Sequence, residues 1–271
     1  MSFRPTNRRV AIVTGAGRGI GAAIVAALAV DGWSVVAVDR CAADRRLPYA
    51  MASEQDLDAA VAAAVGRAGG DDVARAVVAD ASDEGALAAV VEGAEAWGEL
   101  DAFVANAGVI AGGLPSWELP AEQQRALLEV NLEAVMLAAR LVVPALLGRP
   151  RPRAGRFVAV TSSGAARGMS GLAAYSAAKA GVEGFVRGLA ADLHGSGVTA
   201  NALAPGSTDT PLLAESARLF ELPSPRDFAP RQPLERLLAP AEVAAAVAFL
   251  LGPGGAPITG ATLPVDGGLT I

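Results

Sequence analysis

A tyrosine and a lysine, spaced one helical turn apart, are the residues of this sequence best suited to chemistry. Of its 22 lysine and arginine residues, 21 are arginine, and the one lysine, Lys179, follows Tyr175 by four positions. Residues i and i+4 share one face of a helix. A tyrosine has an ordinary pKa of about 10, and a neighbouring cation lowers it toward the range where a general base works. Lysine is a compact point charge and arginine a broad planar fork, so one lysine at this position suits a site that needs a compact cation. Codon bias with a stray surface lysine is the alternative, and the rest of the chain decides between them.

A glycine-rich turn near the N-terminus predicts a binding site for a pyrophosphate. Residues 14–21 read TGAGRGIG, and Gly15, Gly19 and Gly21 lie between a predicted strand and a predicted helix. Gly15 allows a tight turn, Gly19 lets the backbone approach the pyrophosphate, and Gly21 lets the helix pack closely on the sheet. The N–H groups of the helix N-terminus then face the anion. In this context the turn predicts a dinucleotide site that includes Arg18 and Ile20.

The end of the second predicted strand bears on which dinucleotide binds. Asp39 follows Gly15 by 24 positions. A carboxylate there can accept hydrogen bonds from both hydroxyls of an adenine ribose, and it would repel a 2′-phosphate. Arg18 and Arg40 argue the other way, because either side chain could bind that phosphate. Asp39 carries more weight, so NAD is predicted over NADP.

Short apolar segments alternate with longer alanine-rich segments, and this strand-then-helix unit repeats six times. The repetition predicts a parallel sheet covered by helices on both faces, and right-handed crossovers make it a doubly wound, three-layer α/β/α Rossmann fold. The seven predicted strands are Val10–Thr14, Ser34–Val38, Ala74–Ala79, Ala102–Ala105, Arg156–Thr161, Thr199–Leu203 and Thr262–Val265. The predicted helices are Ile20–Val30, Leu57–Arg67, Glu84–Trp97, Ala121–Leu147, Ala173–Leu193 and Pro240–Leu251. We expect one domain over 1–271, with irregular segments at 40–54 and 207–236.

Composition argues against several other classes of protein. The net charge of −6 disfavours nucleic acid as a partner, because counterion release needs a basic surface. With 52% hydrophobic and 18% charged residues, the chain can bury a large core. Cys41 is the only cysteine, so no internal disulfide forms, which fits a reducing compartment. No signal sequence, membrane span or metal-binding cluster is predicted, and we expect a cytoplasmic protein.

Further motifs complete a pattern that resembles the short-chain dehydrogenase/reductase (SDR) family. Besides the turn at 14–21, they are Asp80 with Ala81, Asn106-Ala107-Gly108, Asn131, Ser162, Tyr175 with Lys179, Pro205-Gly206 with Thr208 and Thr210, and PVDGG at 264–268. The motifs follow the family's order over nearly the whole chain. Each motif alone is weak, but the combination is specific. The resemblance implies an oxidoreductase that transfers a hydride between NAD(H) and an alcohol or ketone.

The resemblance also implies a role for the central residues. Tyr175 would be the catalytic acid and base, and Lys179 would bind the nicotinamide ribose and lower the pKa of Tyr175. Asn131 would anchor a water in a proton relay. Ser162 would hold the substrate oxygen, since the family usually places this serine thirteen residues before the tyrosine. Ser163, twelve residues before it, is the alternative. Asp80 would contact the adenine, and residues 106–108 would flank the cofactor.

One part of the chain resembles a subgroup of this family. Gly15 and Asp80 lie 65 residues apart, more than in most members, and the additional residues fall near 40–72. With GVIAGG at 108–113 and PGST at 205–208, this resembles the short-chain dehydrogenases associated with the redox carrier mycofactocin. The resemblance implies an insertion that holds NAD so that it does not exchange, and electrons that leave to the separate carrier. The alternative is an ordinary surface insertion and freely exchanging NAD.

The segment 207–236 predicts the character of the substrate. Its large apolar residues are expected to wall the pocket together with Trp117, which favours a neutral, hydrophobic secondary alcohol or ketone. The expected wall residues are Leu212, Leu213, Leu219, Phe220, Leu222 and Phe228. The alternative is an anion bound by Arg218, Arg226 or Arg231.

Two other functions remain in view. One is an NADP-dependent 3-oxoacyl thioester reductase of the same family, against which Asp39 argues. The other is a nucleotide-sensing regulator, which should have lost Tyr175 or Lys179. The resemblance also implies a homotetramer.

Overall fold

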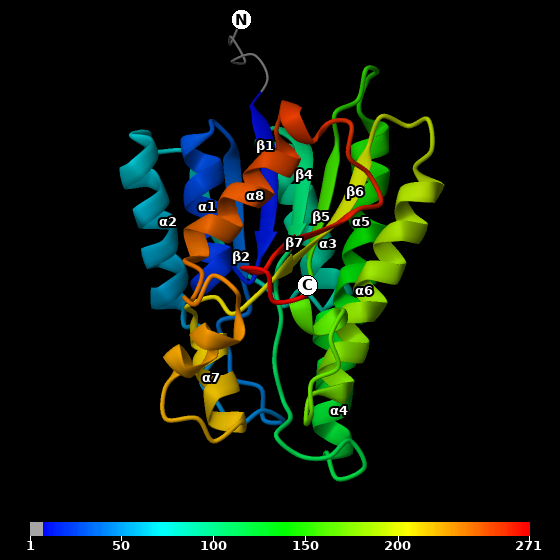
Figure 1. Ribbon diagram of the computed structural model, residues 1–271. Helices are drawn as coiled ribbons and strands as arrows, with labels where there is room; N and C mark the ends of the chain where they lie inside the picture. The colour runs from blue at the N-terminus through cyan, green and yellow to red at the C-terminus, as the bar shows by residue number, and fades with distance from the viewer. Residues whose placement is uncertain (1–7) are drawn as a thin grey trace, which may run out of the picture.

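The computed structural model describes residues 8–271, which build one sheet of seven parallel strands in the order β3-β2-β1-β4-β5-β6-β7 (Figure 1). The chain starts at β1, moves outward to β3, and then returns to the other side of β1 at β4. Strand order therefore reverses between β1 and β4, where open α/β sheets leave a crevice at their carboxyl ends. The strands are β1 (Arg9–Thr14), β2 (Ser34–Asp39), β3 (Ala74–Val78), β4 (Glu99–Ala105), β5 (Arg156–Val160), β6 (Thr199–Pro205) and β7 (Thr262–Val265).

Two apolar layers cover the sheet. On one face, helices α1 (Gly19–Val30), α2 (Glu54–Ala68) and α8 (Pro240–Leu251) bury their apolar sides against the strands. On the other face lie α3 (Glu84–Trp97), α5 (Ala134–Gly148) and α6 (Ala173–Asp192). Both faces of the central strands are therefore buried, as their unbroken apolar sequences require. The predicted doubly wound three-layer fold is confirmed.

The predicted helix over 121–147 differs in detail. It consists of α4 (Ala121–Leu128), a π-helical turn at Glu129–Glu133, and α5, in one continuous stretch. By length and composition alone, this stretch could cross a membrane. Here α5 packs on β4 and β5, and α4 packs against α6. It is a core element of the fold.

The two segments expected to be irregular have different outcomes. Residues 40–53 are irregular, and α2 begins at Glu54, where Ser53 and Asp56 form a capping box. The segment 207–236 is more ordered than predicted, because it holds α7 (Pro211–Leu219) and a 3₁₀ turn at Pro225–Arg231. Its prolines suggested a loop, yet two of them, Pro211 and Pro225, stand at first helical positions, where a missing N–H is no loss.

Candidate active site

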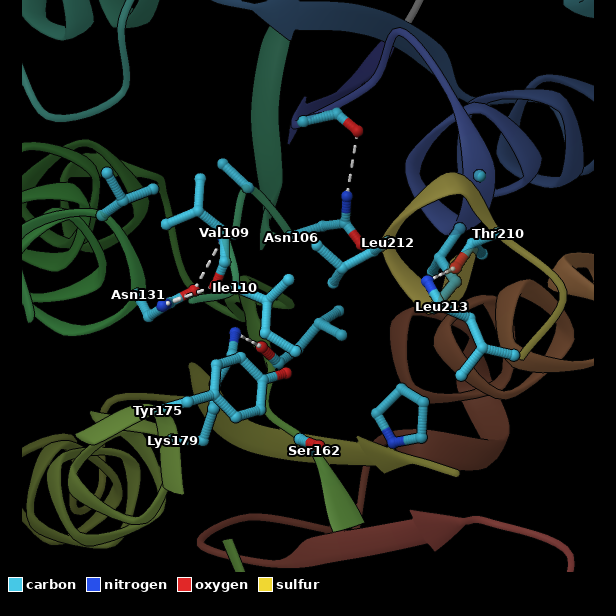
Figure 2. A pocket seen from close by; sticks show the side chains of 18 of the residues that line it. Asn106, Val109, Ile110, Asn131, Ser162, Tyr175, Lys179, Thr210, Leu212 and Leu213 are labelled. Carbon is cyan, nitrogen blue, oxygen red and sulfur yellow. Dashed lines mark hydrogen bonds between the residues drawn. The ribbon is translucent and has the colours of Figure 1, made fainter. Parts of the chain in front are cut away.

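A cavity of about 700 Å³ opens where the carboxyl ends of the central strands meet. All of the predicted cofactor-binding and catalytic positions line it. They are Gly15, Arg18, Gly19, Ile20, Gly21, Asp39, Arg40, Asp80, Ala81, Asn106, Ala107, Gly108, Asn131, Ser162, Tyr175, Lys179, Pro205, Gly206, Thr208 and Thr210. Figure 2 shows Asn131, Tyr175 and Lys179 on one side of this cavity and Thr210 with Leu213 on the other. The fold thus gathers residues from the whole length of the chain.

The glycine turn leaves a backbone cradle at one end of the cavity. Gly15 has a φ of 65°, and a Cβ there would lie 2.7 Å from the Cα of Ala107. A Cβ on Gly21 would overlap the carbonyl oxygen of Gly15. Helix α1 begins here with no side-chain cap and no acidic residue in its first turn. Its free N–H groups and the close backbone fit the pyrophosphate of a dinucleotide.

Asn106 ties β4 to this cradle. Its side-chain amide donates to the carbonyl oxygens of Thr14 and Gly15, both at 3.0 Å. The hydroxyl of Thr14 in turn accepts from the backbone N–H groups of Asn106 and Ala107, both at 3.1 Å. These four hydrogen bonds hold the carboxyl end of β1 against the carboxyl end of β4, so the distance between the two sides of the crevice is fixed.

Asp39 and the nearby arginines are engaged by neighbours. The Asp39 carboxylate accepts from the N–H of Gly17 at 3.0 Å and from that of Cys41 at 3.3 Å. Arg40 pairs with Asp44 at 3.4 Å and Asp80 at 3.6 Å, and Arg18 donates to the carbonyl of Ala50 at 2.8 Å. Both cations that could have bound a 2′-phosphate already have partners.

Tyr175 and Ser162 both line the cavity. Tyr175 lies in the first turn of α6 and is 6% exposed. Burial raises the pKa of its phenol, and the neighbouring Ser162 hydroxyl opposes that rise. Ser162 is partly exposed at the end of β5, and its hydroxyl accepts from the N–H of Gly164 at 3.0 Å. Ser163 also lines the cavity but is buried.

Lys179 lies one turn further along α6 and is 4% exposed. Its Nζ donates to the carbonyl of Val160 at 3.0 Å, and a Cβ on Gly108 would lie 3.3 Å from it. Burial lowers the pKa of Lys179 to about 8. We expected the charge of Lys179 to set the pKa of Tyr175. Burial is instead the largest influence on the pKa of both side chains.

Asn131 lies in the π-helical turn between α4 and α5 and is fully buried. Its amide donates to the carbonyl of Val109 at 2.9 Å, and its Oδ1 accepts from the N–H of the same residue at 3.0 Å (Figure 2). A Cβ on Gly108 would lie 2.9 Å from that Oδ1. Asn131 therefore fixes the segment after β4 against Lys179. Single π turns inside α-helices are frequent at functional sites.

Comparison with known proteins identifies the family. A family model described as enoyl-(acyl carrier protein) reductase matches residues 15–270. A cis-4-hydroxycyclohexanecarboxylate dehydrogenase of Sinomonas cyclohexanicum is 38% identical over 275 residues, which cover 97% of this chain and 96% of that protein. The chain belongs to the short-chain dehydrogenase/reductase family.

Solved SDR structures agree with this assignment. The carveol dehydrogenase from Mycobacterium avium in complex with NAD superposes with a TM-score of 0.89 at 30% identity, over 97% of this chain and 98% of that one. A Serratia marcescens short-chain dehydrogenase/reductase mutant superposes with a TM-score of 0.82 at 31% identity, over 99% and 100%. This SDR is an oxidoreductase, and it has both Tyr175 and Lys179, so the alternative of a regulator without chemistry finds no support.

The substrate end of this SDR cavity differs in part from the prediction. Leu212, Leu213, Phe220 and Phe228 line it, as expected. Leu219 packs in the adjoining apolar cluster instead, and neither it nor Leu222 reaches the cavity. Trp117 is 85% exposed and plays no part in the wall. Sequence reasoning missed Arg167, Met169 and Leu172, which line the cavity from the turn before α6. A loop without a motif gives no signal of its own.

The irregular segment 40–53 is anchored across this end of the SDR fold. Arg46 forms paired hydrogen bonds with Asp44 at 2.7 and 2.9 Å and reaches Glu129, at the start of the π turn, at 2.7 Å. Those contacts hold the pKa of Asp44 well below its ordinary value. The hydroxyl of Tyr49 accepts from the N–H of Ile110 at 2.9 Å, and burial raises the pKa of this phenol to about 12. Tyr49 is therefore a structural contact.

Two further titratable residues, Cys41 and His194, are not placed for chemistry. Burial raises the pKa of the Cys41 thiol to about 11, so it stays protonated and unreactive at neutral pH. His194 is exposed just after α6. Within residues 8–271, no group of three or more His, Cys, Asp or Glu side chains is placed to hold a metal ion.

Proposed function

We propose that this SDR transfers a hydride between NAD and a hydrophobic secondary alcohol or its ketone, with Tyr175 as general acid and base. The observation that carries the proposal is that Tyr175, Ser162 and Lys179 together line one end of the cavity whose other end is the glycine cradle. One continuous space can therefore hold a dinucleotide and place an alcohol against the phenol. When bound, NAD supplies the hydride acceptor.

The residues of the chain manage the proton. Ser162 donates a hydrogen bond to the carbinol oxygen, where negative charge grows as the hydroxyl proton leaves. The phenol oxygen of Tyr175 takes that proton during oxidation and returns it during ketone reduction. With its pKa raised, Tyr175 is protonated at neutral pH, the form that ketone reduction needs. Lys179, with a pKa of about 8, is largely charged there, and its ammonium stabilises the phenolate that oxidation needs.

Asn131 positions this pair. Both polar groups of its side chain bind Val109, so a water held by Asn131 would bind its backbone carbonyl. A π turn interrupts the regular α-helical ladder and can leave such a carbonyl available. We assign Asn131 this anchoring role and Ser162, rather than the buried Ser163, the role of substrate contact.

The preference for NAD rests on the charges around the adenosine end. Asp39 presents a carboxylate where a 2′-phosphate would lie, and the two arginines nearby are occupied by Asp44, Asp80 and Ala50. An NADP-dependent thioester reductase would need a cation free at this place. Asp39 and the pairing of Arg40 with two carboxylates support an NAD-dependent alcohol dehydrogenase, whereas Arg18 donates only to a backbone carbonyl and keeps its charge.

We propose further that NAD stays bound between turnovers and passes its electrons to mycofactocin. The segment 40–53 supports this proposal, because it contributes Ala42, Met51 and Ala52 to the cavity wall. Arg46 and Tyr49 fasten it to the π turn and to Ile110. A bound dinucleotide would leave only after these contacts open, so its exchange should be slow.

Denaturing the purified protein and identifying the released nucleotide tests both points. We expect close to one NAD per chain after extended dialysis, with NADP absent. Full occupancy by NADP would contradict the preference for NAD, whereas an empty protein that turns over in free NAD would end the idea of a captive cofactor and leave the dehydrogenase intact.

The homotetramer is a separate proposal. Two large apolar side chains, Met136 on α5 and Phe249 on α8, are exposed. Burial of both between copies of the chain would remove apolar surface from water. Light scattering should then give four times the mass of one chain, and a monomer would contradict it.

A further inference from the structure

We propose that the substrate of this SDR is a hydroxy acid or its keto acid, whose carboxylate binds Arg231 at the far side of the cavity from the reacting carbon. The proposal rests on the proposed function and narrows the alcohol to one chemical class. The sequence favoured a neutral substrate. We propose instead an anionic substrate with a hydrocarbon portion between its hydroxyl and its carboxylate.

The cavity has carboxylates at one end only, whereas cations line both ends. Its two carboxylates, Asp39 and Asp80, both lie at the adenosine end. The substrate end is lined by two guanidinium groups, Arg167 and Arg231, and its lining residues include no Asp or Glu. A cleft lined by one sign of charge raises the local concentration of ligands of the opposite sign. This end therefore favours an anion.

Arg231 is held in place without being neutralised. Its guanidinium carbon lies 4.9 Å from the ring centre of Phe228 and 6.0 Å from that of Phe220. Among residues 8–271, no carboxylate lies within 4.0 Å of its nitrogens and no side-chain hydrogen bond occupies them. Contact with aromatic rings orients the planar fork and leaves N–H groups available, which is the geometry for bidentate binding of a carboxylate.

The other two arginines of this region do not compete for the role. Arg218 is held by the buried Glu215 through three hydrogen bonds of 2.6 to 3.1 Å. Arg226 and Arg231 are both exposed in the same 3₁₀ turn, but only Arg231 lines the cavity. Arg167 donates one N–H to the carbonyl of Leu269 at 2.6 Å and contributes positive charge beside it. Arg231 is the specificity-determining residue.

An apolar cluster that includes Tyr175 extends to Phe220, whose ring centre lies 6.0 Å from the guanidinium carbon of Arg231. Met169, Leu172 and Leu212 of this cluster also line the cavity. A hydrocarbon ring or chain would fill this stretch, with a secondary alcohol at Tyr175 and Ser162 and a carboxylate at Arg231. A substrate with both groups on adjacent carbons would leave the apolar wall uncovered, so the class is a hydroxy acid with its two groups separated by hydrocarbon.

Matched neutral and anionic probes test the proposal. We would measure kcat/KM for 4-hydroxycyclohexanecarboxylate and for its methyl ester, with NAD and a soluble redox dye both supplied, in wild-type protein, Arg231→Gln and Arg226→Gln. Loss of a charge-assisted contact should lower kcat/KM for the acid about 10- to 100-fold in Arg231→Gln, through KM. The value of kcat/KM for the ester should change little in Arg231→Gln, and Arg226→Gln should resemble wild type with both compounds. Added salt should lower kcat/KM for the acid but not for the ester.

A binding measurement separates this proposal from the proposed function. Isothermal titration with cyclohexanecarboxylate and cyclohexanecarboxamide needs no turnover. We expect wild type to bind the carboxylate more tightly and Arg231→Gln to lose that difference. Equal binding of the two compounds by wild type, or an unchanged difference in Arg231→Gln, would overturn the anionic substrate whatever the activity. If wild type binds the carboxylate more tightly than the amide but oxidises neither the hydroxy acid nor its ester, the result would instead count against the dehydrogenase reaction.

Discussion

The two ends of the cavity hold charge in opposite ways. At the adenosine end, Arg18 and Arg40 already have partners within the chain, and the phosphate cradle consists of backbone. At the substrate end, Arg231 rests on aromatic rings and keeps its N–H groups for a ligand. The difference teaches that the end of a cavity that always binds the same cofactor can pair its charged side chains with other groups of the protein. In our proposal, the end that selects the substrate leaves the Arg231 guanidinium without a carboxylate partner until an anion binds.

The largest effect should come from the reactive pair between these ends. Tyr175→Phe removes the group that moves the proton, and turnover should fall about 10²- to 10⁴-fold, the contribution of general acid–base catalysis. Nucleotide content should stay near that of wild type, because the cradle is untouched. Tyr49→Phe, a change to the only other tyrosine, is the control and should keep turnover. Equal losses in the two variants would remove Tyr175 from its assigned role.

Lys179→Arg keeps the charge and should still lower turnover by about 10²-fold, the effect of misplacing a catalytic group by about 1 Å. The Nζ of Lys179 fits between Gly108 and the carbonyl of Val160, and a broad guanidinium would displace its neighbours. Steady-state kinetics combined with thermal unfolding separate lost chemistry from lost folding. Near-normal turnover would mean that a cation of any shape suffices.

Asp39→Asn probes the adenosine end alone. Asparagine retains an acceptor for the N–H of Gly17 but removes the charge that repels a 2′-phosphate. The affinity for NADP relative to NAD should rise about tenfold or more, the scale of one charged contact. Titration of nucleotide-free protein with each dinucleotide measures the ratio. An unchanged ratio would show that Asp39 does not select the cofactor.

The smallest effect is expected at the segment that covers the cavity. Arg46→Gln breaks the links to Glu129 and to the buried Asp44, which keeps only Arg40 as a cationic partner at 3.4 Å, so the free energy of unfolding should fall by about 1 to 3 kcal/mol. Nucleotide should nevertheless leave faster during dialysis. Arg67→Gln, at an exposed arginine on α2, is the matched control. If both variants retain nucleotide equally well, the segment does not act as a latch.

How much of the site could be predicted depends on how local each signal is. Local sequence predicts the positions of Gly15, Asp39 and Tyr175, because each lies at the end of a predicted strand or at the start of a predicted helix. The contact between Arg46 and Glu129 joins residues 83 positions apart, and no sequence pattern marks it. The π turn at Asn131 interrupts an apolar pattern that reads as one helix.

The apolar residues of the substrate wall also show that local sequence does not determine which side chains reach the cavity. Leu212 and Leu219 both belong to α7 and have the same chemistry, yet only Leu212 reaches the cavity. Which face of a short helix points inward is decided by tertiary packing, which hydrophobicity alone does not encode. For the same reason Trp117 was expected in the wall and lies in solvent.

A single-turnover experiment tests the central claim most directly, that one cavity joins a dinucleotide to an alcohol. Nucleotide-loaded wild-type protein would be mixed with a series of hydrophobic secondary alcohols and hydroxy acids, and the absorbance of the reduced nicotinamide followed, with the organic product identified afterwards. We predict reduced nicotinamide on the protein and an equal amount of ketone with at least one alcohol, and formation of both about 10²- to 10⁴-fold more slowly in Tyr175→Phe. A loaded wild-type protein that forms no reduced nicotinamide with any of them, or a Tyr175→Phe variant that reacts as fast, would contradict it.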